Sequence, residues 1–230
     1  MRIYILSGAG LSAPSGIATF RDGGLWDRYK IEEVCSVEAL KKDLAKVNRF
    51  YDARRAELAK VEPNEAHRYF ATLQSRYKTI HLTQNVDDLL ERAGADPIHL
   101  HGQLTQARCV GCEAVFEIGY EPIAHRSCPK CGSFLRPNVV MFGEVAPNYR
   151  YLYTTEADIF IAVGTSGKVI DIADIAGNYP LSILINPKRE KRVTMFGEFD
   201  EFVDEYFTHF IQKDVVEAID DLESIVRDCV

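Results

Sequence analysis

The chain opens on Arg2-Ile3-Tyr4-Ile5-Leu6-Ser7-Gly8-Ala9-Gly10-Leu11-Ser12-Ala13, the stretch that decides its fold. The apolar run over residues 2–7 predicts a buried strand. A strand that leads into Gly-Ala-Gly-x-Ser at the head of a helix is typical of a phosphate-binding loop. Its glycines let the backbone approach a pyrophosphate, and the helix N-terminus supplies N–H donors. By itself the loop leaves tight packing as an equal alternative, because the acidic residue roughly twenty positions on in dehydrogenases is not evident.

Three further apolar runs predict strands of the same kind, at Thr79–Thr83, Asp158–Gly164 and Leu181–Asn186. Helical patterns lie between and after them, at Asn64–Arg76, Val86–Ala93 and Val215–Val226. Strands that alternate with helices favour an α/β fold, in which a Rossmann-like parallel sheet carries helices on both faces.

Four cysteines follow the spacing Cys-x2-Cys-x15-Cys-x2-Cys, at Cys109, Cys112, Cys128 and Cys131. This spacing is typical of a four-thiolate zinc site; free or disulfide-paired thiols are the alternative. Gly111 and Gly132 are expected to take the positive φ that such turns need. Four thiolates leave no open position on the ion, so the zinc is expected to be structural.

Two segments interrupt the alternation of strands and helices. Trp26–Lys60 is helical and charged, and Gln103–Arg136 holds the cysteines. We expect both to leave the sheet and pack together. The predicted large Rossmann-like domain therefore comprises 1–24, 61–102 and 137–230, and the predicted small domain, a zinc ribbon with a helical segment, comprises 25–60 and 103–136.

Composition excludes several functional classes. Of the 230 residues, 47% are hydrophobic and 27% charged, as in an ordinary globular protein. The net charge of −7 argues against a nucleic-acid groove, which needs a basic face. No run is long enough for a signal-peptide core or a membrane span, so we expect a cytoplasmic protein that contacts no membrane. A reducing cytosol favours metal thiolates over disulfides.

Several motifs, taken in order from about residue 3 to residue 188, resemble the signatures of the sirtuins, which are NAD-dependent protein-lysine deacylases. They are Gly8-Ala9-Gly10-Leu11-Ser12-Ala13-Pro14-Ser15-Gly16-Ile17-Ala18-Thr19-Phe20-Arg21, Thr83-Gln84-Asn85-Val86-Asp87, His99-Leu100-His101-Gly102, the four cysteines, Arg136-Pro137-Asn138-Val139-Val140-Met141-Phe142-Gly143-Glu144, Gly164-Thr165-Ser166 and Ile185-Asn186.

The resemblance implies that NAD and an acylated lysine peptide meet in the cleft between two domains. His101 would be the catalytic base, with Asn85 and Asp87 at the nicotinamide; helix capping is the other reading of Asn85 and Asp87. The implied cofactor-binding residues are Gly8, Ala9, Gly10, Ser12, Ile17, Phe20, Arg21, Gln84, Asn85, Val86, Asp87, Gly164, Thr165, Ser166, Asn186, Pro187 and Lys188. The implied peptide loop comprises Val139, Val140, Phe142, Gly143 and Glu144; a simple edge strand is the alternative.

In the implied reaction, the acyl oxygen attacks the ribose carbon that bears nicotinamide, and an alkylimidate forms. His101 then activates a ribose hydroxyl that attacks this intermediate, which yields free lysine, nicotinamide and O-acyl-ADP-ribose. Mono-ADP-ribosyl transfer to another acceptor is a second reading. A non-catalytic NAD-sensing zinc protein is a third, and the presence of Asn85, Asp87 and His101 argues against it.

Tyr51 and Arg54 stand three residues apart in the helical segment, so they share one face. Spacing alone favours a solvated basic turn beside a packed aromatic. However, Tyr-x-x-Arg resembles the signature of the bacterial sirtuin subclass that removes succinyl and malonyl groups. Arg54 could bind the acyl carboxylate bidentately, and the Tyr51 hydroxyl could donate a further hydrogen bond. We therefore predict removal of succinyl, malonyl and also acetyl groups, with the acidic groups preferred.

Overall fold

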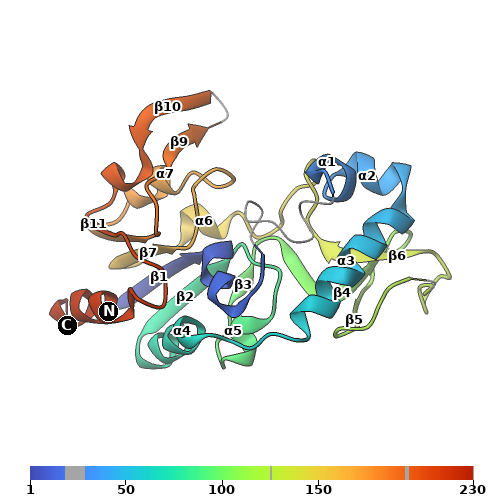
Figure 1. Ribbon diagram of the computed structural model, residues 1–230, viewed down its shortest axis with the longest axis horizontal. Helices are drawn as coiled ribbons and strands as arrows, with labels where there is room; N and C mark the ends of the chain where they lie inside the picture. Colours follow the sequence, from blue (N-terminus) through green and yellow to red (C-terminus); the bar gives the residue numbers. More distant parts are fainter. Residues whose placement is uncertain (19–28, 125, 195–196, 230) are drawn as a thin grey trace.

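The computed structural model describes residues 1–18, 29–124, 126–194 and 197–229 (Figure 1). Its centre is a six-stranded sheet in the order β11-β8-β7-β1-β2-β3, and every neighbouring pair is parallel. The strands are β1 (Arg2–Ser7), β2 (Lys78–Thr83), β3 (Ile98–His99), β7 (Ile159–Val163), β8 (Leu181–Ile185) and β11 (His209–Ile211). The predicted Rossmann-like sheet is confirmed, including its four expected strands; β3 and β11 are short edge strands outside these four apolar runs.

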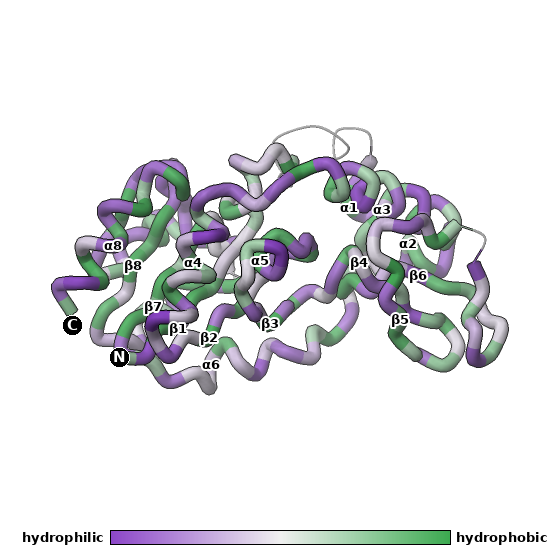
Figure 2. The backbone as a smooth tube through the Cα atoms, turned by 90° about the horizontal axis from the view of Figure 1, so that it is seen from below, coloured by the Kyte–Doolittle hydropathy of each residue, from purple (hydrophilic) through white to green (hydrophobic). Residues whose placement is uncertain are grey.

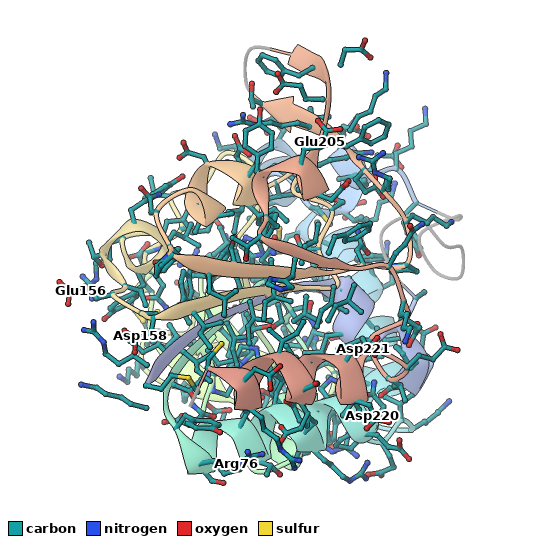
Figure 3. All side chains as sticks on the ribbon, turned by 90° about the vertical axis from the view of Figure 1, so that its left-hand side faces the viewer. Arg76, Glu156, Asp158, Glu205, Asp220 and Asp221 are labelled. Carbon is teal, nitrogen blue, oxygen red and sulfur yellow. The ribbon has the colours of Figure 1, made fainter. Side chains whose placement is uncertain are left out.

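Helices cover both faces of this sheet, because successive side chains of a strand point to opposite sides. Ile3 and Ile5 of β1 face α4 (Glu65–Arg76) and α8 (Ile219–Asp228), whereas Tyr4 and Leu6 face α6 (Tyr151–Thr154) and α7 (Ile172–Ala176). Figure 3 shows α4 and α8 side by side beneath the sheet, with Arg76 labelled on α4. The result is a three-layer domain with one hydrophobic core on each side of the sheet.

A second sheet of three antiparallel strands, in the order β5-β4-β6, belongs to the smaller part of the molecule. Its strands are β4 (Gly102–Cys109), β5 (Val115–Glu117) and β6 (Leu135–Val139). The accompanying helices are α1 (Ile31–Val34), α2 (Val37–Lys42) and α3 (Leu44–Leu58), and Figures 1 and 2 place them beside this sheet, away from β7, β8 and β11. The boundary predicted at residue 136 falls inside β6, so the domain limits remain a prediction.

An antiparallel hairpin of β9 (Lys191–Thr194) and β10 (Gly197–Phe202) projects from the large domain, at the end opposite α1 and α2 in Figure 1. No pattern in the sequence indicated this hairpin. Within the described ranges, no helix is both long and apolar enough to cross a lipid bilayer.

Two of the predicted helices are shorter or shifted relative to their sequence patterns. The pattern at Val86–Ala93 yields only α5 (Leu89–Arg92), because the Asp87 side chain accepts a hydrogen bond from the Leu89 N–H and so ends the preceding loop at that point. The pattern at Val215–Val226 yields α8, which begins at Ile219. The Asn64–Arg76 prediction is confirmed, with Asn64 as the N-cap of α4.

Candidate active site

The candidate site lies where β1, β2 and β7 end, on either side of the central strand β1. Gly8 donates its N–H to the Val163 carbonyl at 2.9 Å, and Gly10 donates to the Gly164 carbonyl at 2.8 Å. A Cβ on Gly10 would lie 2.6 Å from the Gly164 Cα, so only glycine permits this approach. β2 lies on one side of β1 and β7 lies on the other, so the order of the strands reverses at β1. Open α/β sheets bind ligands at such a topological switch point. The glycine loop therefore fits a dinucleotide.

The glycine loop does not lead into a regular α-helix as expected. Two short 3-10 turns, Ala9–Leu11 and Ala13–Ser15, follow β1, and Gly16 ends them with a φ of 92°. The N-cap of α4 holds these turns from the outside, because the Asn64 side-chain amide donates to the Leu11 carbonyl at 2.9 Å and to the Ser15 hydroxyl at 3.1 Å. The loop is thus shaped by α4 rather than by a helix of its own.

A buried network joins the glycine loop to the loop after β2. The Ser12 hydroxyl donates to the Asp87 carboxylate at 2.9 Å and accepts from the Asn85 amide at 3.1 Å. His67 Nδ1 accepts the Asn64 N–H, so its Nε2–H faces the Ser12 hydroxyl at 3.3 Å. Asn85 and Asp87 are therefore brought together, and Ser12 fixes both.

The environment of Asp87 accounts for its raised pKa. Burial raises the pKa of this carboxyl, and the hydrogen bonds from Ser12 and the Leu89 N–H offset only part of that effect. Asp87 thus makes a capping contact with the Leu89 N–H, which is the alternative role considered from the sequence. It also lines a pocket together with Ile17 and Arg54. Phe20 and Arg21, which were expected beside them, lie outside the described residues.

The remaining cofactor-binding candidates surround the same strand ends. The Gln84 amide donates to the Thr165 hydroxyl at 3.0 Å, which links the loops after β2 and β7. The Asn186 amide donates to the Thr165 carbonyl at 3.5 Å and so brings the loop after β8 to the same edge. The other candidates border these loops: Ala9, Val86 and Ser166 are partly buried, and Pro187 and Lys188 are exposed.

His101 lies between β3 and β4, with both ring nitrogens engaged. Nδ1 is 2.9 Å from the Gln84 carbonyl, which can only accept, so Nδ1 carries the proton and Nε2 carries the lone pair. Nε2 accepts from the Tyr149 hydroxyl at 2.7 Å. Burial lowers the pKa of His101, and the Gln84 carbonyl offsets this only in part. The imidazole is therefore neutral at physiological pH and can accept a proton at Nε2.

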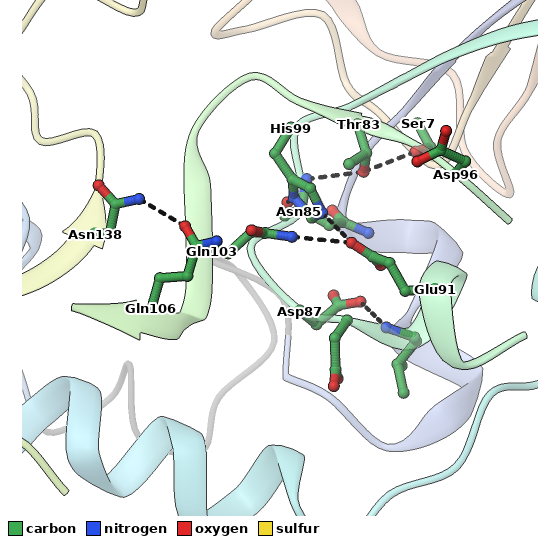
Figure 4. A network of polar contacts seen from close by, with 12 residues as sticks. Ser7, Thr83, Asn85, Asp87, Glu91, Asp96, His99, Gln103, Gln106 and Asn138 are labelled. Carbon is green, nitrogen blue, oxygen red and sulfur yellow. Dashed lines mark hydrogen bonds and ion pairs between the residues drawn. The ribbon is translucent and has the colours of Figure 1, made fainter. Parts of the chain in front are cut away.

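His99, two residues earlier, has the opposite environment (Figure 4). Nε2 lies 2.6 Å from the Glu91 carboxylate, and Nδ1 lies 2.8 Å from the Asn85 carbonyl. Burial lowers the pKa of His99, but the Glu91 carboxylate outweighs it and leaves the pKa raised. Gln103 donates to the same carboxylate at 3.0 Å. His99 therefore braces the Asn85 loop from outside the pocket.

Tyr51 and Arg54 are neighbours on α3 but occupy different surroundings. Arg54 is partly buried and lines the pocket that holds Ile17 and Asp87. Tyr51 is 2% exposed, with its hydroxyl 3.3 Å from the Cys35 sulfur and 3.9 Å from the Met141 sulfur. The structure thus brings Arg54, but not the Tyr51 hydroxyl, to the pocket wall.

The predicted peptide loop begins directly beside His101. Val140 donates its N–H to the His101 carbonyl at 2.9 Å, and Phe142 is about half exposed (52%). Gly143 turns the chain with a φ of 94°. The Glu144 carboxylate accepts from Arg136 at 2.7 Å and from the Met141 N–H at 2.9 Å, and the residue also lines the cleft beside this loop. Glu144 therefore fixes the shape of the loop.

The Sir2 family profile matches residues 8–171. The chain belongs to the Sir2 family. It is 46% identical over 237 aligned residues to an NAD-dependent protein deacylase of Campylobacter jejuni, which covers 98% of this chain and 97% of that protein. It is 43% identical over 199 residues to an NAD-dependent protein deacylase of Helicobacter hepaticus, which covers 76% of this chain and 78% of that protein.

Among solved structures, a Sir2 homolog–NAD complex superposes with a TM-score of 0.84 at 36% identity, and the match covers 99% of this chain and 90% of that chain. The resemblance to the sirtuins is thereby confirmed.

The four cysteines of this Sir2 protein form one cluster, with all sulfur atoms within 4.8 Å of one another. The Cys109–Cys131 and Cys112–Cys128 sulfurs are 3.4 and 3.7 Å apart. Tetrahedral zinc with Zn–S bonds of about 2.3 Å spaces its sulfurs by about 3.8 Å, so the cluster fits one zinc ion. Backbone N–H groups of Gly111 and Cys112 point at the Cys109 sulfur, as expected for a thiolate.

The two zinc-loop glycines differ from expectation. Gly132 has the positive φ that was predicted, at 74°, whereas the first turn takes its positive φ at Glu113, at 57°. Gly111 has another reason to be glycine: a Cβ there would lie 2.5 Å from the Ser133 hydroxyl. The close approach of Ser133, and not the backbone conformation, therefore requires glycine at position 111.

Sequence reasoning missed two residues of the site, His67 and Tyr149. His67 is visible only as part of the capping pattern of α4, and its ring reaches Ser12 because α4 packs against the glycine loop. Tyr149 belongs to no motif and meets His101 through the fold alone.

Proposed function

We propose that this chain, an NAD-dependent protein deacylase of the Sir2 family, removes succinyl and malonyl groups from protein lysines in preference to acetyl groups. The observation that carries this proposal is the position of Arg54. It lines one pocket together with Ile17 and Asp87, next to the loops that fit the dinucleotide. An acyl chain that reaches this pocket would end beside a guanidinium.

The chemistry assigned to His101 follows from its hydrogen bonds. The Gln84 carbonyl holds the proton on Nδ1, so Nε2 is the atom that would accept a proton from a ribose hydroxyl of NAD. Burial keeps the imidazole neutral and therefore ready to act as a base near pH 7. Asn85 and Asp87, held by Ser12, would orient the nicotinamide end of the co-substrate.

Arg54 supports selectivity for dicarboxylic acyl groups. A guanidinium binds a carboxylate through two parallel hydrogen bonds, and such charge-assisted bonds are about twice as strong as neutral ones. The Tyr51 hydroxyl lies within hydrogen-bond distance of the sulfur atoms of Cys35 and Met141, and sulfur is a weak acceptor. Turning this hydroxyl toward a carboxylate would therefore cost little. An acetyl group offers neither residue a charged partner.

A separate cleft of about 580 Å³ runs between the two domains and supports the peptide assignment. Val139 and Val140 form part of one wall, and the segment from Pro97 to Leu100 forms part of the other. An extended peptide could add a strand beside Val140 and take its affinity from backbone hydrogen bonds.

The test compares one peptide that carries succinyl-, malonyl- or acetyl-lysine, with and without NAD, by mass spectrometry. We expect a higher kcat/KM for the acidic acyl groups in the wild type. Arg54→Met should reduce kcat/KM on succinyl-lysine roughly 10- to 100-fold, as expected for a lost charge-assisted pair, and change acetyl-lysine far less. Arg49→Met, on the exposed side of α3, is the matched control and should leave both activities unchanged. Equal loss of both activities in Arg54→Met would refute the proposal.

A second variant tests the base. His101→Ala should lower deacylation about a hundredfold or more, with fold and zinc content intact. Steady-state release of nicotinamide should fall with it, because the intermediate that forms when nicotinamide leaves is no longer consumed. The dependence of this release on an acylated peptide separates deacylation from ADP-ribosyl transfer to another acceptor. Near-normal turnover by the purified, zinc-loaded variant would remove His101 from this role.

A further inference from the structure

Tyr149 hydrogen-bonds to Nε2 of His101, the atom that would accept a proton from the co-substrate. Its hydroxyl is 2.7 Å from Nε2, and the two rings lie 5.8 Å apart between centroids, at 52°. Burial raises the pKa of Tyr149, so the phenol keeps its proton at neutral pH and acts as the donor. A neutral imidazole has a single lone pair, which here lies on Nε2. That atom cannot accept from Tyr149 and from a ribose hydroxyl at the same time.

The segment that carries Tyr149 is tied to β3, the strand directly before His101. The Asn148 amide donates to the His99 carbonyl at 2.8 Å, and Tyr149 donates its own N–H to the Ala146 carbonyl at 3.3 Å. The Tyr149 ring packs against the core on the α6 and α7 side of the sheet. In contrast, Val145, four residues earlier, is 91% exposed. Tyr149 is thus held at His101 by specific contacts.

His101 does not need Tyr149 to hold its orientation. The Gln84 carbonyl fixes Nδ1 at 2.9 Å, and the residue is partly buried. The added contact at Nε2 therefore serves to cover the lone pair. It must break before a substrate hydroxyl can transfer its proton to Nε2 and leave His101 as an imidazolium.

We propose that Tyr149 is a positioning residue that covers Nε2 of His101 in the ligand-free enzyme and gives way to the ribose hydroxyl of the co-substrate. This inference rests on the proposed role of His101 as the base. The net value of one such hydrogen bond, roughly 1 kcal/mol, corresponds to about a fivefold effect on productive binding. Tyr149 thereby sets how much NAD is needed to engage the base.

The test is Tyr149→Phe, which keeps the ring and removes the hydroxyl. We expect kcat/KM for NAD to rise roughly three- to tenfold through a lower KM, with kcat not reduced. Tyr151→Phe is the matched control, because that hydroxyl contacts Arg150 and not His101. The control should leave both parameters unchanged.

A second readout does not depend on activity. Nitrogen-15 NMR of the histidine side chains should show Nε2 of His101 losing a hydrogen bond in Tyr149→Phe. In the wild type, addition of NAD should exchange the hydrogen bond from Tyr149 for one from the ribose hydroxyl and so shift the Nε2 signal. A several-fold lower kcat with unchanged KM would mean that Tyr149 assists the chemical step, which overturns the proposal. Unchanged kinetics together with an unchanged Nε2 signal would overturn it as well. If His101 were not the base, the His101→Ala enzyme would remain active, and this result is distinct from any result obtained with Tyr149→Phe.

Discussion

Histidines around the site show how strongly local contacts set protonation. His67 and His81 are fully buried, and burial lowers their pKa values to about 4 and about 3. His99 is slightly more exposed, with 9% of its side chain accessible, and its contact with Glu91 raises its pKa. His81 shows why the neutral form is required: Ser7 donates its only hydroxyl proton to Thr83, so His81 must donate from Nε2, and Nδ1 has no partner. Protonation would bury a second N–H without an acceptor.

His81 makes the protein less stable as the pH falls. The pKa is about 3 when folded and about 6.5 when unfolded, so the unfolded chain binds more protons between these values. The stabilisation is complete above about pH 6.5 and declines toward about pH 3. Going from about pH 7.5 to about pH 5 should cost about 2 kcal/mol through this residue.

Urea unfolding of the wild type and of His81→Gln at these two pH values measures how much His81 contributes to the free energy of unfolding. Glutamine keeps a donor for Ser7 but does not titrate, and His67 contributes equally to both proteins. The free energy of unfolding should fall by about 2 kcal/mol more in the wild type. Equal losses in both proteins would show that His81 is not the titrating group.

At the scale of elements, the site depends on how closely the ends of β1 and β7 approach. Gly164 has a φ of 60°, and a Cβ there would lie 2.4 Å from the Leu11 nitrogen and 2.6 Å from the Gly10 carbonyl carbon. The glycine loop, in turn, is held by α4 through Asn64. The dinucleotide cradle is therefore a product of three elements rather than of the Gly-Ala-Gly motif alone.

Gly164→Ala should force the two strand ends apart. We expect NAD affinity to fall by a factor of ten or more and unfolding stability to fall by about 2 kcal/mol or more, because both backbone strain and a steric clash are introduced. The measurements are calorimetric NAD titration and urea unfolding.

Gly94→Ala is the matched control for this change. Gly94 also has a positive φ, of 94°, but a Cβ there would meet nothing within 4 Å. It should cost about 1 kcal/mol of stability and leave NAD affinity unchanged. If Gly94→Ala weakened NAD binding as much as Gly164→Ala, the close approach of the strands would not be the cause.

At the scale of the whole molecule, α3 connects the zinc cluster to the pocket. On one side the Asn48 amide donates to the Leu135 carbonyl at 2.9 Å, and the Asp52 carboxylate accepts from the Ile123 N–H at 2.8 Å. On the other side Arg54 lines the pocket. The cysteines hold together the loops of the module on which α3 rests.

Loss of zinc should therefore loosen α3 as well as the zinc loops. Cys109→Ser, or treatment with a chelator, should remove one zinc per chain and lower the Tm by about 5–10 °C, because metal binding contributes folding free energy. Metal analysis, thermal unfolding and hydrogen exchange across Leu44–Leu58 measure these effects. Cys229→Ser, which changes an exposed cysteine outside the cluster, should alter none of them. A zinc-free wild-type protein with the same Tm would contradict this role for the metal.

The amino-acid sequence by itself determined the parallel sheet and the zinc cluster, because both depend on local patterns. Buried strands appear as apolar runs of β-branched residues, and Cys-x2-Cys aims two thiolates at one point whatever surrounds it. The resemblance of ordered motifs to the sirtuins located His101 and the glycine loop, and the family is confirmed.

Only the tertiary structure decided which side chains meet at the site. Ser12 contacts His67 and Asp87, and His101 contacts Tyr149, although these partners lie 55, 75 and 48 residues apart in the chain. No local pattern encodes such pairs, because they arise from the packing of α4 and of the segment before α6 against the sheet. Likewise, no local pattern shows that the positive φ falls on Glu113, or that Gly111 is required by its close approach to Ser133. Hydrogen bonds between distant residues depend on the hydrophobic core, because the core holds in place the elements that carry them.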